Sequence, residues 1–331
     1  MATVVFSSNN SRPRSAPYYK LLEDAGFEVR REDDPKLALG LLSDDETIER
    51  LSGASAVVAW GECYTEKVLT SLPELRVIAR QGVGIDRVDV GTATARDVVV
   101  TVAPNGNYRA VAEHVIAFLF AISRSLVQND KTMKAGEWVG RPVQHLRGTV
   151  LGIIGLGRIG RDVALRAKAM DMNVVATDEY PDEKFAAEHG IEFLDLDSLL
   201  SRSDYVTLNC PLIEGTRGII NRDRIEKMKS GAVLVNTARG GLVVEEDLVA
   251  ALESGHLGGA CLDVFADEPC GADNPLLKFD NVILSPHIGG CDHQAMEDMG
   301  VEASQCVVDL SRGEWPQEAV VNRELKGRWT W

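Results

Sequence analysis

The chain has 331 residues, enough for two domains of ordinary size. Its 45% apolar and 26% charged residues are typical of folded domains rather than of disordered segments. A formal net charge of −15 would repel a phosphate backbone or an anionic lipid surface, so we expect neither nucleic acid nor a membrane as a partner.

Hydropathy and cysteine spacing further restrict the class of protein. The longest apolar run, residues 115–122, is far shorter than the roughly 20 residues of a membrane span. Residues 1–6 are more typical of a strand than of a signal peptide. The six cysteines lack CxxC spacing, which argues against a zinc site and against a small disulfide framework. We therefore predict a cytoplasmic protein with reduced thiols and no bound metal.

The first hundred residues follow a β/α pattern. Short β-branched runs alternate with helical patterns, the runs at 3–6, 56–58, 77–79 and 98–100 and the helical patterns at 16–25 and 66–71. This alternation predicts β/α units around a parallel sheet.

A second series of strands begins near residue 149. A turn at 104–107 leads into an apolar helix expected over 108–127. Strands are then expected at 149–154, 173–177, 205–208, 232–235, 259–264 and 282–284. Buried strands separated by helices are typical of a doubly wound sheet. The helical pattern that begins at residue 294 favours a return of the chain to its first domain.

The predicted fold class is therefore α/β, with two Rossmann-like or flavodoxin-like domains, each a parallel sheet flanked by helices. One domain is discontinuous and comprises residues 1–103 plus 290–331, and the other comprises residues 104–289.

A glycine-rich segment, residues 155–160, connects a predicted strand to a predicted helix. Gly155 permits a tight turn, Gly157 allows the backbone to approach a pyrophosphate, and Gly160 allows close packing of helix on strand. Asp178 ends the next strand, where it would accept hydrogen bonds from ribose hydroxyls and repel a 2′-phosphate, which favours NAD over NADP. Arg158 is either a pyrophosphate contact or a surface arginine.

Polar residues follow three later strands, where open α/β sheets gather their ligands. They include Arg239, Glu268 and His287. Imidazole titrates near neutral pH and suits the proton transfer that accompanies hydride transfer at a carbon bearing oxygen. A carboxylate would fix its tautomer, and a guanidinium would hold a substrate carboxylate. Alternatively, Arg239 forms a structural ion pair and Glu268 is a solvated loop acid.

The other histidines are weaker candidates. His293 stays possible, whereas the remaining four, at positions 114, 145, 189 and 256, lie in helical or turn contexts without convergent polar partners. We interpret those four as structural or surface residues.

Several segments in order make the sequence resemble the D-2-hydroxyacid dehydrogenase family, which includes phosphoglycerate, glycerate and D-lactate dehydrogenases. The resemblance covers nearly the whole chain, and the segments that carry it are residues 80–86, 111–114, 152–160, 236–240, 263–265 and 286–290.

The resemblance implies a small 2-hydroxy or 2-oxo acid as substrate, with NAD as cofactor. It implies that Arg239 binds the substrate carboxylate and carbonyl, that Glu268 pairs with the imidazole, and that His287 is the acid/base. Backbone N–H groups of Val83 and Gly84 would hold the carboxylate from the first, substrate-binding domain, which places the active site in the cleft between the domains. The positions implied for NAD are Gly155, Gly157, Arg158, Ile159, Gly160, Asp178, Pro211, Thr216, Ala238 and Asp263.

The family also implies a homodimer formed by the nucleotide domain, partly through the helix at 111–126. The chain departs from the family in residues 57–62, where phosphoglycerate dehydrogenases carry an arginine for the substrate phosphate. Glu62 stands there instead and would repel a phosphate, so 3-phosphoglycerate is disfavoured as substrate. Residues 209–213 and 291–292 also depart from the usual motifs.

Two other functions would use the same nucleotide fold. A non-catalytic, NAD-sensing corepressor would also bind the dinucleotide, but no basic targeting run is present. Other dehydrogenases with the same nucleotide fold place the nucleotide-binding strand near the N-terminus, whereas here it begins near residue 150.

Overall fold

The chain forms two structural units, and the first is discontinuous because it is built from two separate segments of the sequence. The computed structural model describes residues 1–7, 15–140 and 142–331. One unit comprises Met1–Asn107 and Cys291–Trp331, and the other comprises Tyr108–Gly290. The predicted boundaries had assigned 104–107 and 290 to the opposite units. Residues 104–107 belong to the first unit because Asn105 hydrogen-bonds Glu302, its backbone nitrogen lying 3.0 Å from Oε2.

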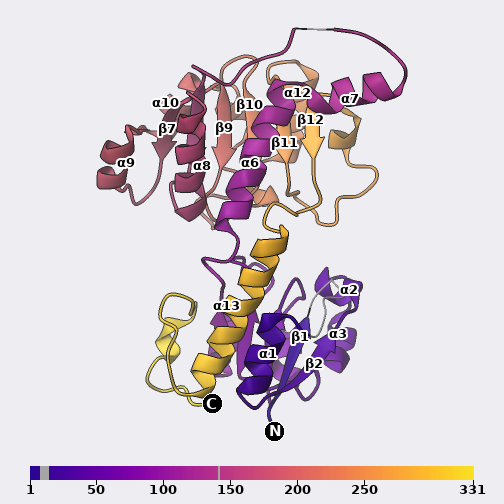
Figure 1. The fold of residues 1–331 in the computed structure, drawn as a ribbon, viewed down its shortest axis with the longest axis vertical. Coiled ribbons are helices and arrows are strands. Elements are labelled where there is room, and N and C mark those ends of the chain that lie inside the picture. The colour runs from indigo at the N-terminus through magenta and orange to yellow at the C-terminus, as the bar shows by residue number, and fades with distance from the viewer. Residues whose placement is uncertain (8–14, 141) are drawn as a thin grey trace. The chain divides into compact units, whose positions relative to one another are not determined.

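The first unit is built on a five-stranded parallel sheet with the order β2-β1-β3-β4-β5. Figure 1 labels β1 and the edge strand β2 of this sheet. Its strands are β1 (Thr3–Ser7), β2 (Glu28–Glu32), β3 (Ala56–Ala59), β4 (Val77–Arg80) and β5 (Val99–Thr101). This flavodoxin-like order reverses between β1 and β3, and such switch points are where open sheets bind ligands, at the carboxyl ends of their strands. The sequence did not predict β2, because four of its five residues are charged and it lies at the edge of the sheet.

Helices cover both faces of this sheet. They are α1 (Pro17–Asp24), α2 (Pro35–Ala38), α3 (Asp44–Leu51), α4 (Glu66–Ser71), α5 (Val90–Ala95) and α13 (His293–Ser311). Because side chains alternate along a strand, Val4 and Phe6 face the cluster that contains residues of α1 and α13, whereas Val5 faces that of α3 and α4. Gly300 lets α13 approach α1, since a Cβ there would lie 2.7 Å from the Tyr18 ring.

The second unit contains a seven-stranded parallel sheet with the order β12-β11-β10-β9-β6-β7-β8. Its strands are β6 (Val150–Ile154), β7 (Asn173–Thr177), β8 (Glu192–Phe193), β9 (Tyr205–Leu208), β10 (Val233–Asn236), β11 (Gly259–Leu262) and β12 (Val282–Leu284). This is the Rossmann order extended by one strand, with its switch point between β6 and β9. The predicted class of two parallel-sheet α/β domains is thus confirmed.

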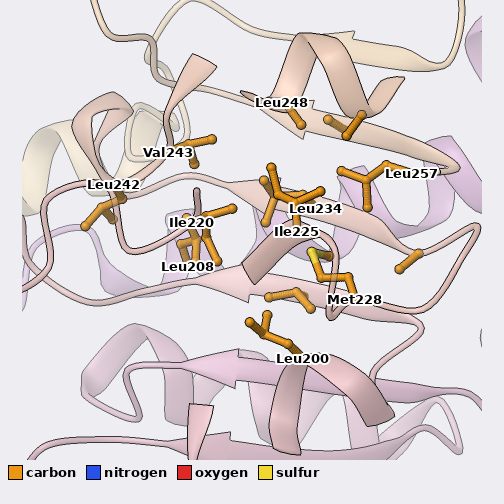
Figure 2. Close-up of a cluster of buried hydrophobic side chains, with 14 of the residues drawn as sticks. Leu200, Leu208, Ile220, Ile225, Met228, Leu234, Leu242, Val243, Leu248 and Leu257 are labelled. Carbon is orange, nitrogen blue, oxygen red and sulfur yellow. The ribbon is translucent and has the colours of Figure 1, made fainter. Parts of the chain in front are cut away.

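Two apolar clusters lie on the two faces of the second sheet, and Figure 2 shows the one that includes Leu208, Leu234 and Leu248. The helices of this unit are α6 (Tyr108–Ser123), α7 (Leu126–Lys134), α8 (Arg158–Ala169), α9 (Glu183–His189), α10 (Leu196–Arg202), α11 (Arg222–Ile225) and α12 (Glu245–Glu253).

The single helix predicted over 108–127 is wrong at its C-terminal end. Ser125 adopts a φ of +47°, which interrupts the helical hydrogen bonds, and α7 leaves α6 at 58°. Across the part of the chain that the structure describes, no single helix is long and apolar enough to span a membrane; α6 and α7 reach that length and composition only as a bent pair.

Candidate active site

The loop between β6 and α8 has the geometry of a dinucleotide-binding turn. Gly155 adopts a φ of +96°, and a Cβ there would lie 2.7 Å from the backbone nitrogen of Cys210 in the loop after β9. A Cβ on Gly160 would lie 2.1 Å from the Gly155 carbonyl oxygen, so both positions require glycine. Around a Cβ built on Gly157, by contrast, no atom of the described residues lies within 4 Å. The space beside Gly157 is open to a ligand.

The N-terminus of α8 is suited to an anion. Gly157 is its N-cap and has no side chain that could accept a hydrogen bond from the first helical turn. Free N–H groups and the helix dipole favour a phosphate at such a position. Arg158 is exposed on this turn, and Ile159 packs against the adjacent apolar cluster.

Asp178, which follows β7, is fixed beside this loop. Its Oδ2 accepts a hydrogen bond from the Leu156 nitrogen at 2.6 Å, and its Oδ1 accepts one from the Tyr180 nitrogen at 2.9 Å. Each carboxylate oxygen can accept more than one hydrogen bond, so both retain capacity for ribose hydroxyls.

Other predicted nucleotide positions lie on loops at the same edge of the sheet. After β9, the Thr216 hydroxyl donates to the Pro211 carbonyl oxygen at 2.6 Å and closes a turn. After β10, the Ala238 nitrogen donates to Oδ1 of Asn236 at 3.0 Å. These loops, the glycine turn and Asp178 together fit a dinucleotide.

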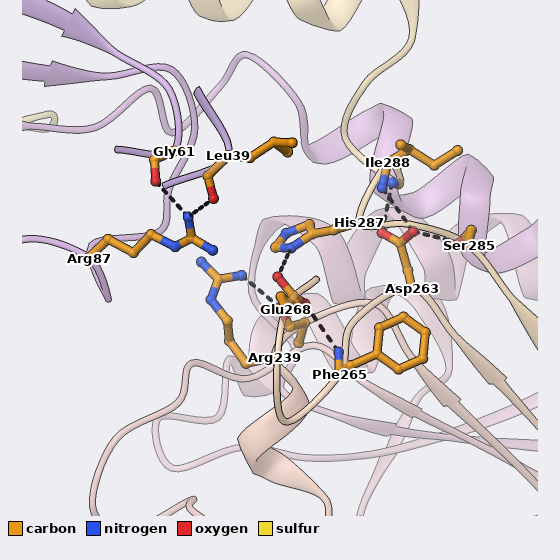
Figure 3. A network of polar contacts seen from close by, with 12 residues as sticks. Leu39, Gly61, Arg87, Arg239, Asp263, Phe265, Glu268, Ser285, His287 and Ile288 are labelled. Carbon is orange, nitrogen blue, oxygen red and sulfur yellow. Dashed lines mark hydrogen bonds and ion pairs between the residues drawn. The ribbon is translucent and has the colours of Figure 1, made fainter. Parts of the chain in front are cut away.

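His287 and Glu268 form a hydrogen-bonded pair. Nδ1 of His287 lies 2.7 Å from Oε2 of Glu268, and the other oxygen of Glu268 accepts from the Phe265 nitrogen at 3.1 Å (Figure 3). Both carboxylate oxygens of Glu268 therefore take part in a hydrogen bond. If the carboxylate accepts from Nδ1–H, Nε2 is the ring nitrogen available to exchange a proton. The His287 side chain is 48% exposed.

Arg239 follows β10, a strand adjacent to β11, whose following loop carries Glu268. Asn236 braces this turn, because its Nδ2 donates to the Arg239 carbonyl oxygen at 2.9 Å. The guanidinium donates from Nη1 to the Ala238 carbonyl oxygen at 2.7 Å. Gly240 lets the two loops meet, since a Cβ there would lie 1.8 Å from the Phe265 carbonyl oxygen.

Asp263 is buried beneath the His287 loop, with 2% of its side chain exposed. Its carboxylate accepts hydrogen bonds from Ser285 Oγ at 2.5 Å, from the Ile288 nitrogen at 2.9 Å and from the Gly289 nitrogen at 2.7 Å. All three donors belong to the same unit as Asp263. The resemblance implies a contact with NAD at Asp263, and in the structure this residue is the centre of a local hydrogen-bond network (Figure 3).

His114 joins this network, which corrects the interpretation of it as a residue without convergent partners. Its Nε2 lies 2.9 Å from Ser285 Oγ and 3.7 Å from Asp263 Oδ1. The two segments are 171 residues apart in sequence, so no local pattern predicts the contact. His293 is exposed at the start of α13, in the first unit.

The first unit presents the predicted carboxylate-binding loop after β4. Gly82 has a φ of +139°, and Nε of Arg80 donates to the Gly84 carbonyl oxygen at 3.1 Å. Val83 is 45% exposed at the tip of this loop.

Glu62 is not a surface acid that could repel a substrate, because it is fully buried. It accepts hydrogen bonds from Ser7 Oγ at 3.1 Å, the Trp60 nitrogen at 3.0 Å and the Tyr64 hydroxyl at 3.0 Å. Burial raises its pKa, although the nearby charge of Arg80 acts in the opposite direction.

Among residues 1–7, 15–140 and 142–331, no group of three or more His, Cys, Asp or Glu side chains could hold a metal ion.

The fold and the glycine turn define a dinucleotide-binding protein of the dehydrogenase type. The profile of the family described as "D-isomer specific 2-hydroxyacid dehydrogenase, NAD binding domain" matches residues 116–289. The chain belongs to the D-isomer-specific 2-hydroxyacid dehydrogenase family, and residues 116–289 are its NAD-binding domain.

Curated relatives and solved structures agree with this assignment. The chain is 38% identical over 275 residues to D-3-phosphoglycerate dehydrogenase of Archaeoglobus fulgidus, a match that covers 82% of this chain and 52% of that protein. It is 37% identical over 285 residues to glyoxylate reductase of Korarchaeum cryptofilum, covering 84% of this chain and 86% of that protein.

Among solved structures, D-lactate dehydrogenase from Aquifex aeolicus, complexed with NAD and lactic acid, superposes with a TM-score of 0.83 at 28% identity, covering 96% of this chain and 98% of that one. The chain spans about half the length of the phosphoglycerate dehydrogenases it matches.

Proposed function

We propose that this protein is an NAD-dependent dehydrogenase that transfers a hydride between nicotinamide and C2 of a small D-2-hydroxy or 2-oxo acid. The observation that carries the proposal is the 2.7 Å pair of His287 and Glu268 on the NAD-binding domain, at the sheet edge where the glycine turn lies. A proton-transferring group is what C2 oxidation requires besides a hydride acceptor.

Each residue has a role in this proposal. His287 takes the proton of the C2 hydroxyl through Nε2 on oxidation and returns it on reduction. Glu268 accepts from Nδ1–H, which orients the ring and stabilises imidazolium as it forms. Arg239 binds the substrate carboxylate and polarises the carbonyl. When bound, the nicotinamide supplies the hydride chemistry.

The binding residues follow the same assignment. In the first unit, the N–H groups of Val83 and Gly84 hold the substrate carboxylate, with the loop braced by Arg80. For the dinucleotide we propose Gly155, Gly157, Arg158, Ile159, Gly160, Asp178, Pro211, Thr216, Ala238 and Asp263, as the family resemblance implies.

The decisive experiment is oxidation of NADH by the purified protein across a panel of 2-oxo acids, with NADPH in parallel. The panel includes glyoxylate, hydroxypyruvate, pyruvate, oxaloacetate and 3-phosphohydroxypyruvate. Turnover of at least one acid with NADH supports the proposal. Binding of NADH with no turnover of any acid contradicts it and favours a sensing role instead.

His287→Ala tests the assigned proton transfer, with His145→Ala as the matched control because His145 is exposed and outside the site. We expect kcat to fall by about 100-fold or more in His287→Ala, with the Kd for NADH nearly unchanged. Equal loss in both variants, or no loss in His287→Ala, refutes the role.

We also propose a homodimer formed through the nucleotide domain. Apolar side chains of α6, α7 and the segment after them are exposed on the isolated chain, namely Phe120, Leu126, Val127, Met133 and Trp138. Exposed apolar patches mark interaction sites. Light scattering should give the mass of two chains, and Phe120→Asp should shift the mass toward one. A single-chain mass for the unaltered protein contradicts the dimer.

All six cysteines are free, which supports the further proposal that the protein works in a reducing compartment such as the cytoplasm. Fractionation of cells that express the tagged protein tests this location.

A further inference from the structure

Three polar side chains form a chain of contacts beneath the loop that carries His287. His114, on α6, has its Nε2 2.9 Å from Ser285 Oγ, and that hydroxyl lies 2.5 Å from Oδ1 of Asp263. His114 is 22% exposed and Asp263 is 2% exposed, so the contacts are largely shielded from water. Polar contacts in such a setting are stronger than at a surface.

The direction of each hydrogen bond follows from the inventory of donors. A serine hydroxyl has one proton, and a carboxylate can only accept, so Ser285 donates to Asp263. The remaining contact then requires Nε2–H of His114 to donate to Ser285. Burial lowers the pKa of His114, against the opposing effect of Asp263, which is consistent with a neutral ring.

These residue types also make up hydrolase triads, but the geometry differs from a triad. In a triad the carboxylate and the hydroxyl contact opposite ring nitrogens. Here both face the same nitrogen, Nε2, and the serine proton is directed to the carboxylate. Ser285 is therefore not an activated nucleophile, and the contacts serve another purpose.

The hydrogen bonds that Asp263 accepts indicate that the network positions the loop that carries His287. Its carboxylate accepts from the backbone nitrogens of Ile288 and Gly289, and its carbonyl oxygen accepts from the His287 nitrogen at 2.8 Å. Asp263 thus fixes three successive peptide nitrogens at and after the catalytic candidate. His287 itself has a φ of +54°, a conformation that a side-chain-bearing residue keeps only when its surroundings impose it.

The approach of the loop to this network is close. A Cβ on Gly289 would lie 2.8 Å from Oδ2 of Asp263 and 3.4 Å from Cδ2 of His114. The His114 ring also meets the Phe118 ring edge-on, with centroids 4.4 Å apart. The imidazole is consequently held in one place on α6, and the loop is packed directly on it.

We infer that His114 is a positioning residue for the proposed reaction, acting through Ser285 and Asp263 to hold His287 in the orientation that proton transfer needs. The inference rests on the proposed role of His287. Displacement of a catalytic group by about 1 Å can cost 100-fold in rate, so the network has a measurable effect on turnover.

The test compares His114→Phe, His114→Gln, Ser285→Ala and the double variant His114→Phe/Ser285→Ala. Phenylalanine keeps the ring against Phe118 but removes the donor, whereas the glutamine amide can reach the position of Nε2–H. Glu113→Gln, on the exposed neighbouring position, is the control. Thermal unfolding of each variant separates loss of fold from loss of position.

We expect kcat of His114→Phe and of Ser285→Ala to fall about 10-fold to 100-fold, with KM for the acid and Kd for NADH changed less than about threefold. His114→Gln should recover most of the loss, and the double variant should be no worse than the poorer single variant. Unchanged kcat in His114→Phe, an equal loss in His114→Gln, or multiplicative losses in the double variant would overturn the inference.

A second measurement separates this inference from the proposed function. In ¹⁵N-labelled protein, the imidazole signal of His287, assigned with His287→Ala, reports its environment without substrate. It should move in His114→Phe and return in His114→Gln. If the unaltered protein turns over no acid, the proposed function fails while this shift still supports the positioning network; an unmoved signal overturns the network alone.

Discussion

Alanine substitution at two glycines of the dinucleotide turn should separate binding from stability. At Gly157 the backbone is extended, with φ −74° and ψ −159°, so alanine is not strained there. No described atom would contact the new methyl group within 4 Å. The loss in folding free energy is the difference between glycine and alanine as N-caps, about 0.5–1 kcal/mol.

The same methyl group stands in the open space that we assign to the pyrophosphate. We therefore expect Gly157→Ala to weaken NADH binding at least tenfold, about 1.4 kcal/mol, while the protein stays folded. The difference in helix propensity between glycine and alanine would not weaken NADH binding, because it changes the free energy of folding rather than that of binding. Titration of NADH fluorescence gives the Kd, and urea unfolding gives the free energy of unfolding.

Gly160→Ala is the matched comparison within the same turn. Its Cβ would lie 2.1 Å from the Gly155 carbonyl oxygen and 3.2 Å from Ile153 Cγ2. Alanine gains about 1 kcal/mol in helix propensity. Overpacking against a fixed backbone costs about 1–3 kcal/mol or more, so the net effect is destabilising. If Gly157→Ala instead unfolds the protein, or leaves NADH binding intact, the assignment of this space to the dinucleotide is refuted.

Three further predictions concern carboxylates. Glu268→Gln should lower kcat about 100-fold with little change in the Kd for NADH, because the amide no longer stabilises imidazolium; steady-state kinetics with an unchanged kcat would exclude that role. Asp178→Ala should raise the ratio of kcat/KM for NADPH to that for NADH, since the repulsion of a 2′-phosphate is removed; a constant ratio argues against Asp178 as the selector. Glu62→Gln should alter how stability depends on pH. The folded state raises the pKa of Glu62, so its contribution to stability is fully present below the unfolded pKa and is lost as pH rises through the folded pKa. Relative to Glu62→Gln, the unaltered protein should therefore lose unfolding free energy from about pH 4 upward, as urea titrations at several pH values would reveal; a pH-independent difference contradicts this account.

Local patterns in the sequence were sufficient to predict most strands and the glycine turn. The turn is predictable because strand, glycines, helix and Asp178 lie within one short stretch of chain. The edge strand β2 was missed, since Glu28–Glu32 is mostly charged and hydrophobic periodicity is the main strand signal. The break at Ser125 was not predicted, because a serine rather than a glycine or proline adopts the left-handed conformation there.

The sequence supplies the residue types of the candidate site but not the contacts that support them. Arg239, Glu268 and His287 lie in the loops that follow β10, β11 and β12, and adjacent parallel strands bring such loops to one edge of the sheet. The role of Asp263 as the centre of a local network depends on partners at His114 and Ser285, far away in sequence. The buried Glu62 likewise accepts a hydrogen bond from Ser7, 55 residues away in sequence. Tertiary contacts of this kind leave no periodic signal.

The discontinuity of the first unit imposes an order on biosynthesis. Ala303, Val307 and Leu310 of α13 fill the core on one face of the β1–β5 sheet, so that face stays uncovered until α13 leaves the ribosome. Tyr108–Gly290 is continuous and has its own clusters, so it can complete its core earlier. The unit whose synthesis starts earlier is therefore completed after Tyr108–Gly290, and during that interval its uncovered apolar sheet face is prone to aggregation.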